Sequence, residues 1–472
     1  MNKKNMFALL TALALLTASA GCGAKEMTET TDAPIVAEKS NGEAVMNDAA
    51  GAPAEAGEAA DDAAPAAAPA AVDEGAYAEA EYDMAAGDAD FAYGADAKLT
   101  ARTAGSPVLN GEFGAVDGAE VADDVLTAEP MPAAGEVGVL TAGEWRDHDN
   151  WGFFANLVNT GAIAFPSFGL DPTHRVEVTV HDAAGTALPN ADVVLTQEDG
   201  GVLWTAKTDK NGVAYLFEGA GTGTSVTVTA PDGATATETL PPLAADTQSE
   251  TPLCTSRSAE ITLESAPVLA PDMQVMFIVD TTGSMGDEMM YLQSDFTALT
   301  EEIEGETAYS VLFYKDEGDD YVTRSSGDFT SDTAEIKRAL AAEYASGGGD
   351  EPEAVAQALT AAFIDQHWSE DAVKVAFLIY DAPPHDGTEE DLQAAIGTAA
   401  EMGIHLVPVV SSNGSRETEL FGRAAAICTN GSYVFLTDDS GVGGSHLEPI
   451  IGDHEVELLH DIIVRIVNDY RQ

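Results

Sequence analysis

One carboxylate and two hydroxyls stand at alternate positions in a short stretch of this chain, at Asp280, Thr282 and Ser284. Residues 275–279, just before them, are all apolar, which is typical of a strand buried on both faces of a parallel sheet. In a doubly wound sheet, ligands bind outside the carboxyl ends of the strands, where this stretch would form a turn. Oxygen ligands of this kind suit hard divalent cations. The stretch therefore predicts a metal site.

Two further loops carry acidic residues at comparable places. Asp350 follows three glycines at 347–349, which allow the backbone to approach an ion closely. Asp381 directly follows the apolar residues 375–380. In a parallel sheet, all three loops lie at one edge. Because Asp280 by itself could equally be a helix cap, it is the convergence of three acidic loops that favours metal binding.

Alternating strands and helices are predicted from Asp272 onward, and they would position these loops. This alternation predicts a doubly wound α/β domain over residues 267–472. The expected strands cover residues 309–314, 373–380, 404–410 and 433–436, and the expected helices cover 331–344, 353–364, 389–402, 417–427 and 455–470.

Residues 273–470 resemble a von Willebrand factor A-type domain with a metal-ion-dependent adhesion site. The family motif D-x-[ST]-x-S is matched by Asp280, Thr282 and Ser284, and its second Asp by Asp381. Asp350 stands where the family usually has a Thr. The resemblance implies that the hydroxyls bind a divalent cation directly, with the Asp residues acting directly or through water. Mg²⁺ is the first expectation, with Ca²⁺ and Mn²⁺ as alternatives. An acidic group of a protein partner would complete the coordination.

A serine hydrolase is the competing enzyme hypothesis, because Ser284, Asp381 and His446 follow the order of a hydrolase triad. The nucleophile elbow needs a Gly two residues before the Ser, where Thr282 stands. An acid four residues before Ser284 suits ligation better than activation of a nucleophile. We therefore expect no catalysis, and we expect His385 and His446 to be loop residues.

The middle of the chain, residues 143–266, predicts a small antiparallel β-sandwich preceded by an aromatic segment. Short alternating strands are expected at 176–180, 191–195, 203–204, 213–217 and 225–229, with turn residues between them. The stretch resembles carboxypeptidase-regulatory-like (Ig-like) and collagen-adhesin B-type sandwiches, which implies a spacer or binding module. We expect His174, Arg175 and His181 at its surface.

The N-terminus predicts export. Lys3, Lys4 and an apolar run over residues 6–16 are typical of a signal peptide at 1–21. The segment resembles a bacterial lipoprotein signal, in which Cys22 would be lipidated. Ser19 departs from that pattern, and cleavage at an ordinary signal-peptidase site, with secretion, is the alternative. Residues 22–142 are rich in Ala, Asp and Glu, with few large apolar residues, which predicts a disordered tether.

The formal net charge of −61 excludes some partners. Such a field repels nucleic acid and anionic membrane surfaces, whereas it concentrates divalent cations. Cys254 and Cys428 could form a disulfide in an exported protein or remain free and buried. Together these features predict a lipid-anchored, cell-surface protein with a metal-dependent, adhesion-type binding domain. The alternative is a structural or assembly factor of the cell envelope whose metal serves folding alone.

Overall fold

The computed structural model describes residues 140–165, 168–242, 253–270, 272–349, 351–440 and 445–471. All of them belong to one compact unit, Gly118–Gln472. The predicted signal peptide, Cys22, nearly all of the predicted tether and Asp350 lie outside the described residues. In the ranges that are described, no helix is both long and apolar enough to cross a bilayer.

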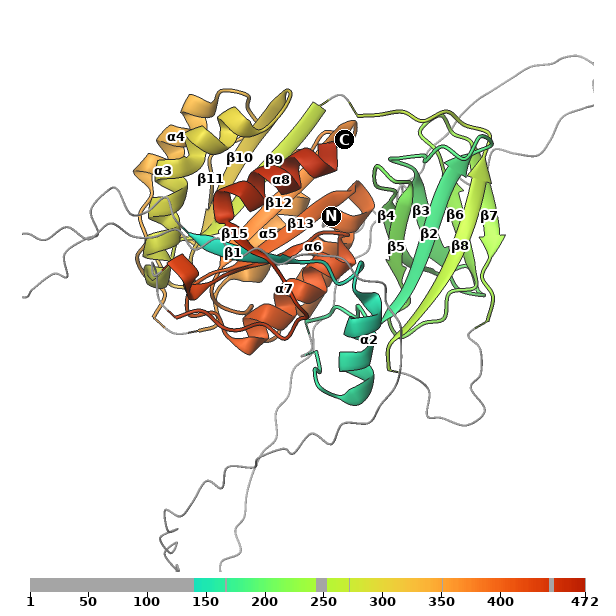
Figure 1. The fold of residues 1–472 in the computed structure, drawn as a ribbon, viewed down its shortest axis with the longest axis horizontal. Helices are drawn as coiled ribbons and strands as arrows, with labels where there is room; N and C mark the ends of the chain where they lie inside the picture. Colours follow the sequence, from blue (N-terminus) through green and yellow to red (C-terminus); the bar gives the residue numbers. More distant parts are fainter. Residues whose placement is uncertain are drawn as a thin grey trace, which may run out of the picture. The chain divides into compact units, whose positions relative to one another are not determined.

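An eight-stranded, mostly parallel sheet forms the centre of the C-terminal domain, in the order β11-β10-β9-β12-β13-β14-β1-β15 (Figure 1). The five strands from β10 to β14 in this order run parallel to one another. This arrangement confirms the predicted doubly wound α/β fold. The strands are β1 Thr141–Trp145, β9 Asp272–Asp280, β10 Thr307–Tyr314, β11 Thr323–Ser325, β12 Ala372–Tyr380, β13 Ile404–Val410, β14 Tyr433–Leu436 and β15 Val456–Leu458.

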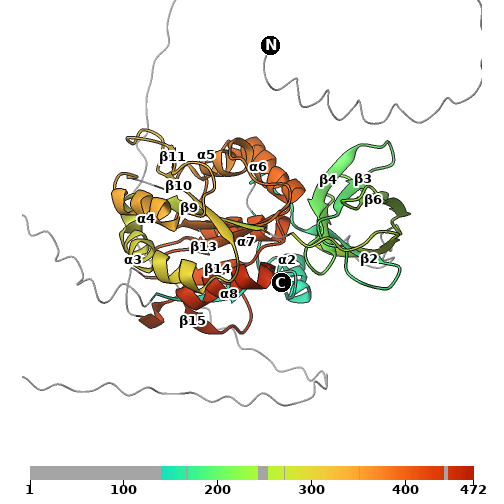
Figure 2. The ribbon, with the colours of Figure 1, turned by 90° about the horizontal axis from the view of Figure 1, so that it is seen from above.

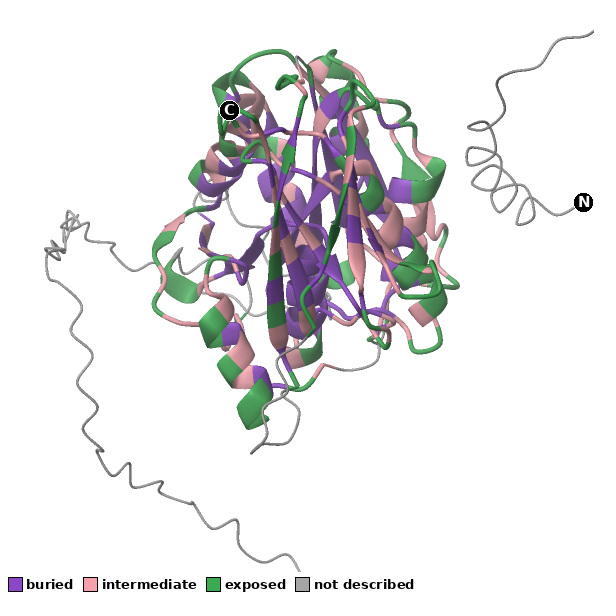
Figure 3. Ribbon diagram, turned by 90° about the vertical axis from the view of Figure 1, so that its right-hand side faces the viewer, coloured by how far each residue is buried: buried purple, intermediate pink, exposed green. Residues whose placement is uncertain are grey.

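Helices cover both faces of this sheet because its strands are apolar on both sides. Met276 and Ile278 of β9 join one hydrophobic cluster, whereas Phe277 and Val279 join another. Residues of α5, α6 and α7 complete the first cluster, and residues of α3, α4 and α8 complete the second (Figure 2). Buried positions run along the strands (Figure 3). The helices are α3 Gly286–Glu302, α4 Thr333–Ala342, α5 Val355–Thr360, α6 Glu389–Met402, α7 Arg416–Cys428 and α8 Leu459–Arg471.

Strand β1 joins the central sheet although it comes before the sandwich in the sequence. It pairs antiparallel with β14 on one side and with β15 on the other. Residues 143–145 were predicted to belong with the sandwich, but they lie in β1. The last helix was predicted to begin at residue 455. That start was wrong, because Val456–Leu458 pairs with β1 and α8 begins only at Leu459. A short helix, α2 Trp151–Thr160, follows β1.

The residues before the α/β domain form two small sheets, in the orders β5-β2-β8 and β4-β3-β6-β7. Alternating residues of β2, Val176, Val178 and Val180, are fully buried in the core between them. The pairing is antiparallel, as predicted, except that β2 and β8 run parallel. The strands are β2 His174–Asp182, β3 Asp192–Thr196, β4 Val202–Lys207, β5 Val213–Phe217, β6 Ser225–Thr229, β7 Thr235–Thr239 and β8 Thr255–Leu263.

Arg175 is not the surface residue that the sequence suggested. It is only 6% exposed, and its guanidinium carbon lies 4.0 Å from the centre of the Trp151 ring. One guanidinium nitrogen also donates to the backbone oxygen of His148 at 3.3 Å. The prediction failed because the covering side chains come from the segment before the sandwich, and strand periodicity carries no information about them. Cys254 and Cys428 are both buried and free.

Candidate metal site

The turn after β9 holds the first group of predicted ligands. Asp280 is fully buried, and its Oδ1 accepts hydrogen bonds from the backbone N–H and the Oγ1 hydroxyl of Thr282, both at 2.8 Å. Asp280 Oδ2 is also buried and has no hydrogen-bond partner. The Oγ atoms of Thr282 and Ser284 lie 3.5 Å apart, and Ser284 is exposed. The turn thus fixes one carboxylate oxygen, while the buried hydroxyl of Tyr314 also lies close to this carboxylate.

Asp381 stands at the same edge of the sheet. It follows β12, which runs parallel to β9 with Ile379 opposite Val279, so both strands end together. Burial raises the pKa of Asp381 to about 6. Burial and the nearby charge of Asp381 raise the pKa of Asp280 to about 7. Each carboxylate is costly to ionise in this place, and a bound cation would reverse the sign of the local field.

The glycine loop passes directly over the turn. Gly347 O accepts a hydrogen bond from the backbone N–H of Gly283 at 3.1 Å, and Gly348 N donates to Asp319 Oδ2 at 2.8 Å. Gly347 and Gly348 have φ angles of +85° and +71°, which favour glycine. A Cβ on Gly347 would lie 2.3 Å from Asp319 Oδ1. Glycine is therefore required for this close approach of backbone to backbone and carboxylate.

Glu353 is a site residue that the sequence analysis missed. It is 4% exposed, and its Oε2 is buried without a hydrogen-bond partner. Burial, followed by the charge of Asp280, raises the pKa of Glu353 to about 9. No signal in the sequence distinguishes it from Asp350 and Glu351, the other acids of the loop, and it lies just before α5.

These loops enclose a cavity of about 290 Å³. Thr282, Ser284, Asp381 and Glu353 all line it, while Asp280 is buried next to Thr282. In the part of the chain that is described, no three or more His, Cys, Asp or Glu side chains form a ready-made metal group. The donor set is instead mixed, with hydroxyls beside carboxylates. Because it contains two buried carboxylate oxygens without partners, this set fits a hard divalent cation.

The hydrolase triad suggested by sequence order is not assembled. His446 Nε2 lies 3.2 Å from the hydroxyl of Ser412, and its Nδ1 lies 2.7 Å from Asp438 Oδ1. The Ser412 hydroxyl also donates to the buried Glu288 Oε1 at 2.9 Å. His446 is thus engaged by Ser412 and Asp438, whereas the hydroxyl of Ser284 lies beside that of Thr282. His385 contacts a loop carboxylate, with its Nε2 2.6 Å from Asp316 Oδ1.

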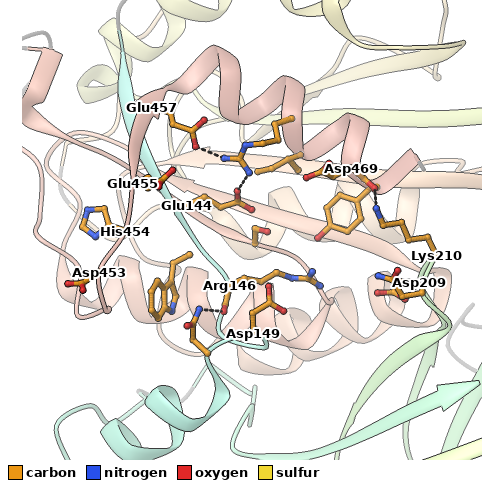
Figure 4. Close-up of a pocket in the computed structure, with 17 residues that line it drawn as sticks. Glu144, Arg146, Asp149, Asp209, Lys210, Asp453, His454, Glu455, Glu457 and Asp469 are labelled. Carbon is orange, nitrogen blue, oxygen red and sulfur yellow. Dashed lines mark hydrogen bonds and ion pairs between the residues drawn. The ribbon is translucent and has the colours of Figure 1, made fainter. Parts of the chain in front are cut away.

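A larger cavity of about 1040 Å³ lies among β1, α8 and the residues before β15, with further lining residues from 209 to 211 (Figure 4). None of the predicted site residues lines it. Several of its charges already have partners: Arg465 donates to Glu144 at 2.6 Å and to Glu457 at 2.8 Å, and Lys210 donates to the backbone oxygen of Asp469. We therefore place the candidate site at the smaller cavity.

Comparison with known proteins agrees with this fold. The family model of the von Willebrand factor A domain matches residues 274–442, so this segment is similar to von Willebrand factor A domains. Among solved structures, the chain is similar to the conserved hypothetical protein BatB from Bacteroides thetaiotaomicron, with 13% identity and a TM-score of 0.25. The match covers 42% of this chain and 86% of that chain. No curated protein matches the chain.

Proposed function

We propose that this chain presents a non-catalytic, divalent-metal-dependent protein-binding domain of the adhesion type. The observation that carries this proposal is the buried carboxylate of Asp280. Its Oδ2 has no hydrogen-bond partner, and its Oδ1 accepts from Thr282, which lines the cavity with Ser284 and Asp381. A buried carboxylate oxygen without a partner is costly. A cation would supply the missing partner and offset that cost.

Each residue has a role in this proposal. The hydroxyls of Thr282 and Ser284 are direct ligands, while Asp280 and Asp381 supply negative charge directly or through water. Asp350, the remaining ligand suggested by the sequence, lies outside the described residues. The cation is Mg²⁺, Ca²⁺ or Mn²⁺, and when bound it supplies a Lewis-acidic position that an acidic group of a protein partner completes.

Calorimetric titration of the full chain with Mg²⁺ and with Ca²⁺ tests the metal site. We expect one saturable site, which is lost in Asp280→Asn. Absence of heat with either ion at millimolar concentration contradicts the proposal. Capture of partners from an envelope extract, with and without EDTA, then tests the function. Partner binding that survives chelation in a still-folded protein would favour the structural or assembly factor instead.

We also propose that the protein is held outside the cytoplasm by lipid attached to Cys22. The support comes from the sequence alone, as a signal-like run that ends at this cysteine. Cys22→Ser should move the protein from the membrane fraction to the medium, as followed by fractionation and immunoblotting. Equal membrane retention of both proteins would show that the anchor is not at Cys22.

A further inference from the structure

The carboxyl group of Glu353 has an environment that a structural role does not explain. It is 4% exposed, it lines the small cavity, and its Oε2 has no hydrogen-bond partner. Only the backbone of Glu353 is tied down, by an N–H bond to the Pro383 oxygen at 3.1 Å. A buried carboxyl with a purely structural role would be expected to have a cation or a hydrogen-bond donor beside it.

This carboxyl lies close to Gly348. A Cβ on Gly348 would lie 2.9 Å from Glu353 Oε1 and 3.1 Å from Thr282 Cβ. The Glu353 carboxyl and the Thr282 side chain therefore border the same glycine from two sides. Thr282 is in turn bonded to Asp280 at 2.8 Å. Glu353 thus faces the predicted ligands and points away from bulk solvent.

We propose that Glu353 is a direct ligand of the metal and that it makes the site prefer Ca²⁺ to Mg²⁺. This inference rests on the proposed function. With Thr282 and Ser284 it gives one carboxylate and two hydroxyls at the cavity, while Asp280 and Asp381 add negative charge directly or through water. Ca²⁺ accepts six to eight oxygens in a flexible geometry and takes carboxylates in one- or two-oxygen contact. Mg²⁺ requires a near-ideal octahedron and keeps several waters, so a crowded anionic site suits it less.

The alternative is that Glu353 is a neutral, structural carboxyl that never touches the ion. Both roles predict that Glu353→Gln leaves the fold intact, because the amide keeps the shape and removes a buried charge. The two roles predict different effects of Glu353→Gln on the affinity for the metal. A ligand lost from a metal site weakens binding strongly, whereas a neutral neighbour replaced by an amide of the same shape has little effect.

The test is calorimetric titration of the full chain and three variants with Ca²⁺ alone and with Mg²⁺ alone, with circular dichroism to verify folding. Glu351→Gln is the matched control. Glu351 lies two positions before Glu353 and lines the same cavity, but its side chain is exposed, and the substitution removes the same charge. We expect Glu353→Gln to weaken Ca²⁺ binding by more than about tenfold, which corresponds to ~1.4 kcal/mol. Glu351→Gln should change it by less than about threefold, as a long-range charge effect. Glu353→Thr should lower the ratio of the Ca²⁺ affinity to the Mg²⁺ affinity.

The possible results distinguish a wrong role for Glu353 from a wrong assignment of metal-dependent binding. If Glu353→Gln binds Ca²⁺ as the wild type does, or if Glu351→Gln weakens binding more, Glu353 is not a ligand and the metal-dependent function stands. If the wild type binds Mg²⁺ more tightly than Ca²⁺, the proposed selectivity is wrong. If neither ion binds the wild type, the proposed function fails as well.

Discussion

Two buried clusters of charged residues in this molecule differ in one respect, the presence of cationic partners. In the first, the fully buried Arg423 donates to both oxygens of Asp147, at 2.9 and 2.7 Å. It also donates to Glu419 at 3.3 Å and to the backbone oxygen of Ile450 at 2.8 Å. The guanidinium is thus shared between two buried acids and a carbonyl. This cluster joins the segment after β1 to helix α7 and needs no further ligand.

The second cluster contains Asp280, Asp381 and Glu353, which are 0%, 5% and 4% exposed. These carboxyls are as buried as those around Arg423, yet no Lys or Arg pairs with them among the residues that the structure describes. Instead, burial raises the pKa of each. The charge of Asp381 adds to this effect at Asp280, that of Asp280 at Glu353, and that of Glu288 at Asp381. The difference teaches that burial alone does not distinguish a structural cluster from a binding site. An excess of unpartnered acceptors does.

The largest expected effect breaks the first cluster. Arg423→Met should lower the free energy of unfolding by about 3–5 kcal/mol, because it leaves Asp147 buried without a cation and removes one of the two arginine partners of Glu419. Urea unfolding measures this. Arg465→Met is the control, since Arg465 pairs with Glu144 and Glu457 through a side chain that is 39% exposed, and it should cost no more than ~1 kcal/mol. Similar costs for the two variants would remove the distinction between the clusters.

The second cluster should make the metal-free protein less stable as the pH rises. The pKa values in the folded state are about 7 for Asp280, about 6 for Asp381 and about 9 for Glu353, against ordinary values of 3.8, 3.8 and 4.5. Between these limits the native state holds protons that the unfolded chain releases, so stability is greatest below about pH 4 for these groups. We expect the free energy of unfolding in EDTA to fall by several kcal/mol from pH 4 to pH 9. One pKa unit corresponds to ~1.4 kcal/mol, and coupling between the sites makes the total smaller than the sum of the separate shifts.

Unfolding in urea at several pH values, in parallel for wild type and Asp280→Asn, isolates this contribution. The variant lacks the group that titrates between about pH 4 and pH 7, so its curve should be flatter over that range. Curves of equal slope would mean that the raised pKa of Asp280 does not contribute to stability.

Added metal should oppose this loss at neutral pH. A ligand that binds only the native state at 100 times its Kd stabilises by about 2.7 kcal/mol. Thermal melts with saturating Ca²⁺ or with EDTA should therefore differ at pH 7. They should differ much less at about pH 4, because protonated carboxyls bind metal weakly. A melting temperature that is unaffected by metal at pH 7 would show that the second cluster is not a metal site.

The smallest expected effect concerns the glycine that separates Glu353 from Thr282. Gly348→Ala should cost about 1–2 kcal/mol, from a left-handed φ of +71° and from contacts at 2.9 and 3.1 Å. Gly233→Ala is the control, because Gly233 has a φ of +87° with nothing within 4 Å. Gly233→Ala should therefore lose stability only through the strained backbone conformation, because its added Cβ meets no neighbouring atom. Only Gly348→Ala should also weaken Ca²⁺ binding, as measured by calorimetry.

Local sequence patterns predicted much of the site. The apolar run before Asp280 and the one before Asp381 indicated buried parallel strands, and β9 and β12 are adjacent in the sheet. A parallel sheet brings such strand ends to one edge, so Thr282, Ser284 and Asp381 could be assigned to a common cavity before the structure. The turn is formed by residues within five consecutive positions, Asp280 to Ser284, so its conformation depends mainly on the local sequence.

Glu353 could not be chosen over its neighbours from the sequence, because Asp350, Glu351 and Glu353 are all acidic. Which of them faces the cavity depends on how the glycine loop packs on Thr282 and on how α5 is held. Glu351 is exposed, whereas Glu353 is buried. Burial of a charge is decided by the surrounding elements and has no signature in spacing.

The sequence by itself thus determined the strands, most of the helices and the chemistry of the turn at Asp280, because periodicity and turn composition act over a few residues. Only the tertiary structure decided that β1 lies between β14 and β15, and that Asp147 meets Arg423 across 276 positions. It likewise decided that Trp151 covers Arg175. Such contacts depend on which apolar faces and charges remain unpaired once the local elements have formed, and that is a property of the whole packed domain.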